Sequence, residues 1–177
     1  NNQATGLLPR IADVQETITP IEGSWNVYFD PRWGGPGKVV FDELIDWTVH
    51  ADTGIRYYSG TVVYHKELNL AMPAQNERLL LRFPRLGSLA RVWVNGKEVV
   101  TVWCSPWEAD ITSYVHEGKN NLKIEVVNSL MNRMIGDASL PESERFTYAY
   151  PQIATPTDKL VPSGIMEQLN LVYRQCQ

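Results

Sequence analysis

The sequence LARVWVNGKEVVTVW, residues 89–103, decides the fold class. Two runs rich in β-branched and aromatic residues meet at Asn95-Gly96, the dipeptide that best tolerates positive φ at both centres of a type I′ turn. This pattern predicts a tight antiparallel hairpin, and a two-residue turn fixes its register. The expected pairs on the core face are Val94 with Lys97, Val92 with Val99, and Ala90 with Thr101. The opposite face, made by Arg91, Trp93, Glu98 and Val100, is too polar for a dry core, so we expect it to meet a partner.

The rest of the chain adds short strands and very little helix. Apolar alternation bounded by Gly, Pro and Asn predicts strands at 24–29, 38–41, 55–70, 78–83, 121–128 and 165–173. A short strand or turn is expected at 44–49, a single helical turn capped by Asp110 at 110–115, and irregular chain at 129–162. This inventory predicts an all-β protein, and a jelly-roll β-sandwich accommodates the strand count.

Length and composition indicate one domain. The 177 residues, 44% of them hydrophobic, suffice for a single core, which we place at 21–177 behind a linker or N-terminal extension at 1–20. The net charge of −4 comes without a basic stripe, so nucleic acid is not expected as a partner. No apolar run approaches the roughly 20 residues that span a bilayer, so no membrane partner is expected either. Because the chain starts at Asn1 without a signal-like segment, we expect a processed or excised part of a longer protein.

Aromatic and polar residues in the predicted loops suggest carbohydrate binding. A sugar ring stacks its C–H face on an aromatic ring, while its hydroxyls need Asn, Asp and Arg partners. The candidate residues are Trp33, Trp103, Trp107, Asn132, Arg133 and Asp137. Packing is the alternative for each tryptophan, because large aromatics serve cores more often than sites, and we assign Trp25 to the core.

Other chemistry has little support in the sequence. Asp137 with Glu142 or Glu144 could form a glycosidase-type carboxylate pair, but solvated charges, with Asp137 paired locally to Arg133, explain the same residues. No His/Cys/Asp spacing matches a metal site, so no metal or other cofactor is predicted. A structural Ca²⁺ on loop oxygens stays open. Cys104 and Cys176 do not indicate a disulfide framework.

Five motifs occur in an order that resembles the sugar-binding, galactose-binding-like jelly-roll domain of family 2 glycoside hydrolases. They are YSGTVVY (58–64), LLLRF (79–83), ARVWVNGK (90–97), PWEADIT (106–112) and GKNNLKIEV (118–126). Three further segments are similar to the C-terminal domain of bacterial family 106, α-L-rhamnosidase-like enzymes. These are WNVYFDPRWGGP (25–36), IRYYSG (55–60) and NSLMNRMIGD (128–137).

The resemblance implies an accessory domain in a large, secreted or periplasmic bacterial glycoside hydrolase that degrades plant polysaccharide, either α-L-rhamnosidase-like or β-galactosidase-like. In such enzymes the catalytic carboxylates lie in a separate barrel, so this chain alone is expected to be non-catalytic. Two functions remain open. The domain either contacts carbohydrate beside its parent's active-site cleft, or it is a scaffold that docks on the catalytic domain of the same polypeptide without binding sugar.

Overall fold

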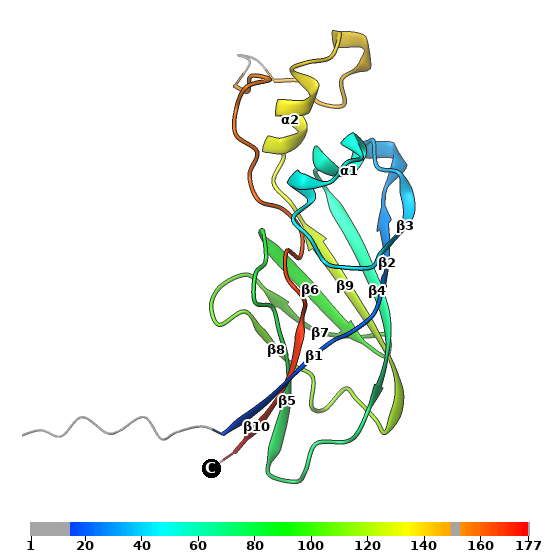
Figure 1. The fold of residues 1–177 in the computed structure, drawn as a ribbon, viewed down its shortest axis with the longest axis vertical. Helices are drawn as coiled ribbons and strands as arrows, with labels where there is room; N and C mark the ends of the chain where they lie inside the picture. The colour runs from blue at the N-terminus through cyan, green and yellow to red at the C-terminus, as the bar shows by residue number, and fades with distance from the viewer. Residues whose placement is uncertain (1–14, 150–152, 177) are drawn as a thin grey trace, which may run out of the picture.

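The computed structural model describes residues 15–149 and 153–176 and shows two packed antiparallel sheets (Figure 1). The four-stranded sheet has the order β1-β10-β5-β8, with β1 Glu16–Pro20, β10 Asn170–Gln175, β5 Glu77–Arg82 and β8 Glu108–Asp110. The six-stranded sheet has the order β3-β2-β4-β9-β6-β7, with β3 Gly37–Phe41, β2 Trp25–Phe29, β4 Thr61–Leu70, β9 Gly118–Val127, β6 Leu89–Val94 and β7 Lys97–Val102. This arrangement confirms the predicted all-β, galactose-binding-like jelly-roll sandwich.

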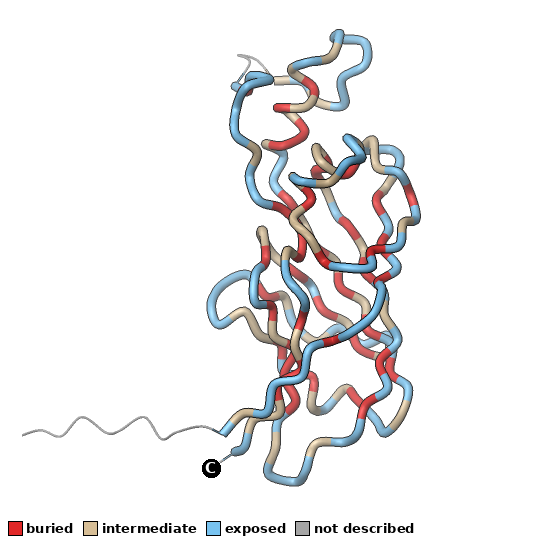
Figure 2. Tube along the Cα trace, viewed as in Figure 1, coloured by how far each residue is buried: buried red, intermediate tan, exposed pale blue. Residues whose placement is uncertain are grey.

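Alternation along the strands builds the core. Every second residue of β2 is buried, and β9 buries alternate residues from Asn120 onward, so the inner face of the larger sheet packs on the smaller sheet (Figure 2). Trp25 lies in this core, as predicted, with its ring edge-on to Tyr64. The Tyr64 hydroxyl accepts a hydrogen bond from the buried Trp47 indole at 2.8 Å, which satisfies a polar group that burial would otherwise penalise.

The central hairpin forms around the predicted turn but pairs differently beyond it. Asn95 and Gly96 have φ of 51° and 78°, as a type I′ turn requires, and Val94 pairs with Lys97. A bulge between Val92 and Trp93 then shifts the register by one residue. The observed pairs are Val92 with Val100 and Ala90 with Val102, so the predicted partners Val99 and Thr101 were wrong.

Several predicted element boundaries also change. The turn predicted at 110–115 forms at 112–114, where the Tyr114 amide donates to the Ile111 carbonyl at 2.9 Å, but it does not extend into a helix. Asp110, the last residue of β8, caps it as predicted, because its carboxylate accepts hydrogen bonds from the backbone amide and hydroxyl of Thr112. The long strand begins only at Thr61, after the short helix α1 (Thr53–Arg56), and the last strand begins at Asn170. Short 3₁₀ helices occupy η1 Pro31–Trp33, η2 Trp47–Val49 and η3 Glu142–Glu144.

The segment predicted to be irregular contains a helix, and the predicted linker contributes a strand. Helix α2 (Met131–Asp137) lies within 129–162, at the end of the sandwich where β9 stops (Figure 1). Residues 16–20 form β1, which pairs with β10, so the sheet begins inside the segment assigned to a linker. Residues 1–14 of that segment lie outside the described residues.

An ion-pair network joins the strands of the smaller sheet. Arg82 of β5 contacts Glu16 of β1 at 2.8 Å and Glu108 of β8 at 2.6 Å. Arg174 of β10 contacts the same two carboxylates, at 2.7 and 2.8 Å. The hydrogen bond from Arg82 and, less strongly, that from Arg174 lower the pKa of Glu16 below its ordinary value. Shared charges therefore tie the N-terminal strand to the sheet.

Candidate functional site

The candidate site lies at the end of the sandwich capped by α2, α1 and the loop from 30 to 36 (Figure 1). Two polar contacts place α2 on the sheet end. The Asn128 side chain donates to the Tyr58 carbonyl at 3.2 Å, and the Arg133 amide donates to the Ser59 hydroxyl at 3.1 Å. Both side-chain partners are buried, so the start of α2 is fixed relative to the strands beneath it.

Gly136 allows α2 to lie directly against α1. A Cβ atom at this position would come within 2.6 Å of the Tyr57 ring, so no larger residue fits without a shift. The glycine thus sets the distance between α2 and the end of α1, and it places the side chains of Arg133 and Asp137 in the cap.

The Asn132 side chain is buried, and its amide group hydrogen-bonds to other parts of the protein. Its amide nitrogen donates to the Val161 carbonyl and to the Ser163 hydroxyl, each at 2.7 Å. Its oxygen accepts from the Val161 amide at 2.8 Å. In the described state Asn132 therefore fastens residues 161–163 to α2.

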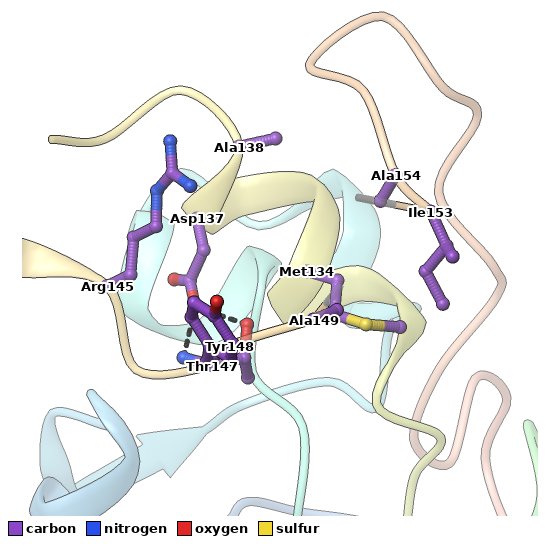
Figure 3. Close-up of a pocket in the computed structure, with 9 residues that line it drawn as sticks. All are labelled: Met134, Asp137, Ala138, Arg145, Thr147, Tyr148, Ala149, Ile153 and Ala154. Atoms are coloured by element: carbon purple, nitrogen blue, oxygen red, sulfur yellow. Dashed lines mark hydrogen bonds between the residues drawn. The ribbon is translucent and has the colours of Figure 1, made fainter. Parts of the chain in front are cut away.

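Asp137 holds the chain that follows the helix. Its Oδ2 atom accepts three hydrogen bonds, from the Phe146 amide at 3.0 Å and from the amide and hydroxyl of Thr147 at 2.7 Å each. Asp137 and Thr147 line a small hollow of about 50 Å³. Figure 3 shows them with other lining residues, among them Met134, Tyr148 and Ile153. Oδ1, in contrast, is buried without a hydrogen-bond partner among the described residues.

Arg133 is a buried cation with incomplete pairing. Its side chain is only 7% exposed, and its Nη1 lies 3.8 Å from Asp137 Oδ1, which is an ion pair but too long for a hydrogen bond. The guanidinium carbon lies 4.9 Å from the centre of the Phe146 ring. Nε and Nη2 have no hydrogen-bond partner in the described chain. Burial lowers the pKa of this guanidinium, against the opposing effect of Asp137.

A second hollow, of about 340 Å³, has Arg133 in its wall. Its other lining residues include Gly34, Thr53, Tyr57, Ser139 and Phe146. Loop, helix and returning chain therefore meet around one cation. The local Arg133–Asp137 pairing inferred from sequence is present, but the two charges are buried and not solvated as that alternative assumed.

The three candidate tryptophans do not form one site. Only Trp33 belongs to the same end of the sandwich as Arg133 and Asp137. Trp33 is 50% exposed and precedes Gly34 in the β2–β3 connection, so it belongs to the capped end. Trp103 is 70% exposed and follows β7, at the opposite edge of the six-stranded sheet. At a strand spacing of about 4.8 Å the two edges are on the order of 20 Å apart. Trp107 packs partly against the core. Sugar contact by the six candidates stays a prediction.

The structure also bears on the carboxylate pair, the metal sites and the cysteines considered in the sequence analysis. Glu142 and Glu144 are exposed on η3, whereas Asp137 is buried. Within residues 15–149 and 153–176, no group of three or more His, Cys, Asp or Glu side chains could hold a metal ion. None of the helices in that same part of the chain is long and apolar enough to cross a membrane. Cys104 and Cys176 are free and exposed.

Sequence reasoning missed the partners of Arg133. These partners, Ser59, Gly34 and Phe146, come from three other segments of the chain, and no local sequence pattern links any of them to Arg133. The only available signal was the density of glycines and polar residues in 30–36 and 128–137, because such residues permit close approach of chain segments.

Comparison with known proteins identifies the family to which this two-sheet sandwich belongs. Residues 12–174 match the model of the glycosyl hydrolases family 2 sugar-binding domain, and the chain belongs to this family. It is similar to a rhamnosidase from Novosphingobium sp. PP1Y, with a TM-score of 0.85 and 30% identity over 90% of this chain and 15% of that one. It is 38% identical over 123 residues to the "Putative beta-glucuronidase" of Formosa agariphila, covering 68% of this chain and 11% of the relative.

A more distant solved structure shares the fold alone. The β-glucuronidase of Ruminococcus gnavus aligns with a TM-score of 0.61 at 22% identity, over 89% of this chain and 28% of that one. The chain therefore spans less than a third of the length of each of these three proteins. It corresponds to one domain of larger glycosidases.

Proposed function

We propose that this chain is a non-catalytic domain that contacts carbohydrate next to the catalytic domain of a larger glycoside hydrolase. The observation that carries the proposal is the capped end of the sandwich, where α2 buries Arg133 and Asp137 in a polar cluster. The exposed Trp33 precedes Gly34, which lines the same hollow as Arg133. A cap needed only for stability would be better filled with apolar side chains, because buried charges are costly. Polar groups at such a cost indicate a binding role.

We further propose which class of glycosidase the larger enzyme belongs to. The similarity to a rhamnosidase supports an α-L-rhamnosidase-like parent, whereas the curated relative is named for glucuronide chemistry. We favour the first, because the alignment to the rhamnosidase covers more of this chain. A bacterial enzyme of this kind that degrades plant polysaccharide would be secreted or periplasmic, since polymeric substrates are met outside the cell.

A scaffold role without sugar binding is the second candidate, and one surface supports it. The outer face of the six-stranded sheet has a hollow of about 570 Å³, whose lining residues include Tyr28, Val40 and Val63 together with Lys38 and His65. Such an apolar patch fits a docking interface. The Trp93 part of this face is less suited to docking, because the Lys123 ammonium lies 3.7 Å from the Trp93 ring.

Titration of the chain with sugars tests the first candidate. Tryptophan fluorescence and calorimetry against rhamnose, galactose, glucuronic acid and pectic oligosaccharides should show saturable binding. The variant Trp33→Ala should weaken it, because Trp33 is exposed at the capped end. Trp107→Ala serves as a comparison from the partly buried β7–β8 connection. Absence of binding across the panel by a folded chain would leave the scaffold role.

A further inference from the structure

Among the described residues that line the hollow beside α2, a single one is charged. Arg133 is that residue, and the remainder of the wall is glycine, aromatic, aliphatic or hydroxyl-bearing. The nearest paired anion is Asp137, whose Oδ1 lies 3.8 Å from Nη1 and whose Oδ2 already accepts three hydrogen bonds. The hollow is therefore locally cationic in a chain with a net charge of −4.

The unpartnered atoms of Arg133 form one edge of its guanidinium. Nε and Nη2 are both buried and both lack a hydrogen-bond partner among the described residues. These two N–H groups point in parallel, and a carboxylate accepts from both at once, one oxygen to each. The ion pair with Asp137 involves Nη1, so it leaves this edge unused. A planar anion with two oxygens is the ligand that would complete it.

We propose that the Arg133 hollow binds the carboxylate of an acidic sugar residue, a uronate, through Nε and Nη2. The inference rests on the proposed function, which supplies carbohydrate as the ligand class; the hollow adds the requirement for negative charge. Thr53 and Ser139 in the same wall bring hydroxyl groups suited to the sugar's own hydroxyls. A volume of about 340 Å³ lies within the range of small-molecule sites.

Phe146 controls access to the guanidinium edge. Its ring lies over Arg133, and a Cβ on Gly34 would come within 2.9 Å of that ring and 3.2 Å of Nη2, so loop and ring enclose the cation closely. Phe146 is 43% exposed and lies in an irregular segment. Binding therefore requires the ring to swing outward, with the carboxylate taking its place against Arg133.

Calorimetry with a matched pair of ligands tests the inference. The chain is titrated with a galacturonate trisaccharide and with the same trisaccharide after its carboxyl groups have been reduced to alcohols. We expect the acidic form to bind about tenfold more tightly or better, as one charge-assisted bidentate contact allows. Arg133→Met should abolish that preference. Arg133→Lys should keep part of it, because lysine retains the charge but not the paired donors.

Arg32→Met is the matched control. It removes the same charge from the same end of the molecule, but the Arg32 side chain is 85% exposed and paired with Asp30 outside the hollow. The preference for the acidic ligand should survive in this variant. Folding is checked by thermal unfolding, where Arg133→Met should still unfold cooperatively but at a lower temperature, because the buried Asp137 carboxylate loses its ion-pair partner.

The failures of the two proposals are distinguishable. Equal binding of the acidic and neutral trisaccharides, or equal damage from Arg32→Met and Arg133→Met, overturns the uronate site while leaving carbohydrate binding intact. No binding of either ligand by the folded chain overturns both.

Discussion

Asn132, predicted from sequence to contact sugar, has a structural role in the protein. Its three short hydrogen bonds to Val161 and Ser163 attach the returning chain to α2. The sequence predicts it as a candidate sugar contact because it lies in a segment rich in polar residues. It could not indicate burial, because the residues that cover Asn132 lie about 30 positions later in the chain.

We expect Asn132→Ala to lower the free energy of unfolding by about 3 kcal/mol, because it removes the three hydrogen bonds that the fully buried Asn132 side chain makes with Val161 and the buried Ser163. Chemical denaturation of the variant measures the change. Asn69→Ala, at an exposed position of β4, should change stability by no more than about 0.5 kcal/mol. Equal effects of the two substitutions would contradict the fastening role of Asn132.

At the scale of single elements, hairpin residues were predictable and their pairing was not. The Asn95-Gly96 turn and the buried Val92 follow from local rules. The bulge after Val92 depends on how β6 also pairs with β9, which is a tertiary effect. Helix α2 was missed for a similar reason. It is short, contains Gly136 and lacks a side-chain cap, so packing and not propensity makes it a helix.

Asn95 in the hairpin turn contributes to stability in two ways, through its side-chain hydrogen bonds and through its tolerance of a positive φ. The Asn95 side chain donates to the Tyr114 carbonyl at 2.9 Å and to Asn120 Oδ1 at 2.8 Å, and accepts from the Asn121 amide at 2.9 Å. Asn95→Gly keeps the positive φ but loses these bonds, which should cost about 2 kcal/mol. Asn95→Ala should cost about 1 kcal/mol more, because a Cβ disfavours that conformation. Thermal and urea unfolding compare the two; an alanine variant as stable as the glycine variant would refute the φ contribution.

The network of the smaller sheet makes stability depend on pH. Hydrogen bonds from Arg82 and Arg174 lower the pKa of Glu16 in the folded state. Its contribution is therefore fully present above the unfolded-state pKa of about 4.3 and is lost as the pH falls through the lower, folded-state pKa. Urea unfolding from pH 6 downward should show this loss below about pH 4.

Glu16→Gln should reduce the acid-dependent part of that loss, because glutamine has no proton to gain. At neutral pH the variant should be less stable by about 1 kcal/mol, as expected for a half-buried pair. An unchanged acid profile in the variant would show that other carboxylates dominate. Glu67→Gln is a suitable control, since the Glu67 side chain pairs with Lys119 on the exposed face of β4.

At the scale of the whole molecule, the fold was predictable because every level of the sequence agreed. Alternating strands, turn residues and motif order all indicated one sandwich. The site was only partly predictable. Asn132, Arg133 and Asp137 share one helix, but Trp33 and Trp103 come from opposite edges of the larger sheet, which no local pattern reveals. Residues chosen for similar chemistry were therefore not all neighbours.

The chain alone is expected to leave aryl α-L-rhamnosides and aryl β-D-glucuronides unhydrolysed. Glycoside hydrolysis needs two carboxyl groups facing one cleft, about 5–10 Å apart, with one free to deliver a proton. Asp137 is buried, with three hydrogen bonds on Oδ2, while Glu142 and Glu144 are exposed on η3. Release of p-nitrophenol from the two substrates should match the rate without protein.

Asp137→Asn makes the hydrolysis test decisive in both directions. A trace of activity that persists unchanged in this variant would come from a contaminating enzyme. Activity that disappears with the carboxylate, in a variant that still binds sugar and unfolds cooperatively, would instead make Asp137 a catalytic residue and this chain an enzyme. We expect neither activity nor its loss, because the Asp137 carboxylate is engaged in holding residues 146 and 147.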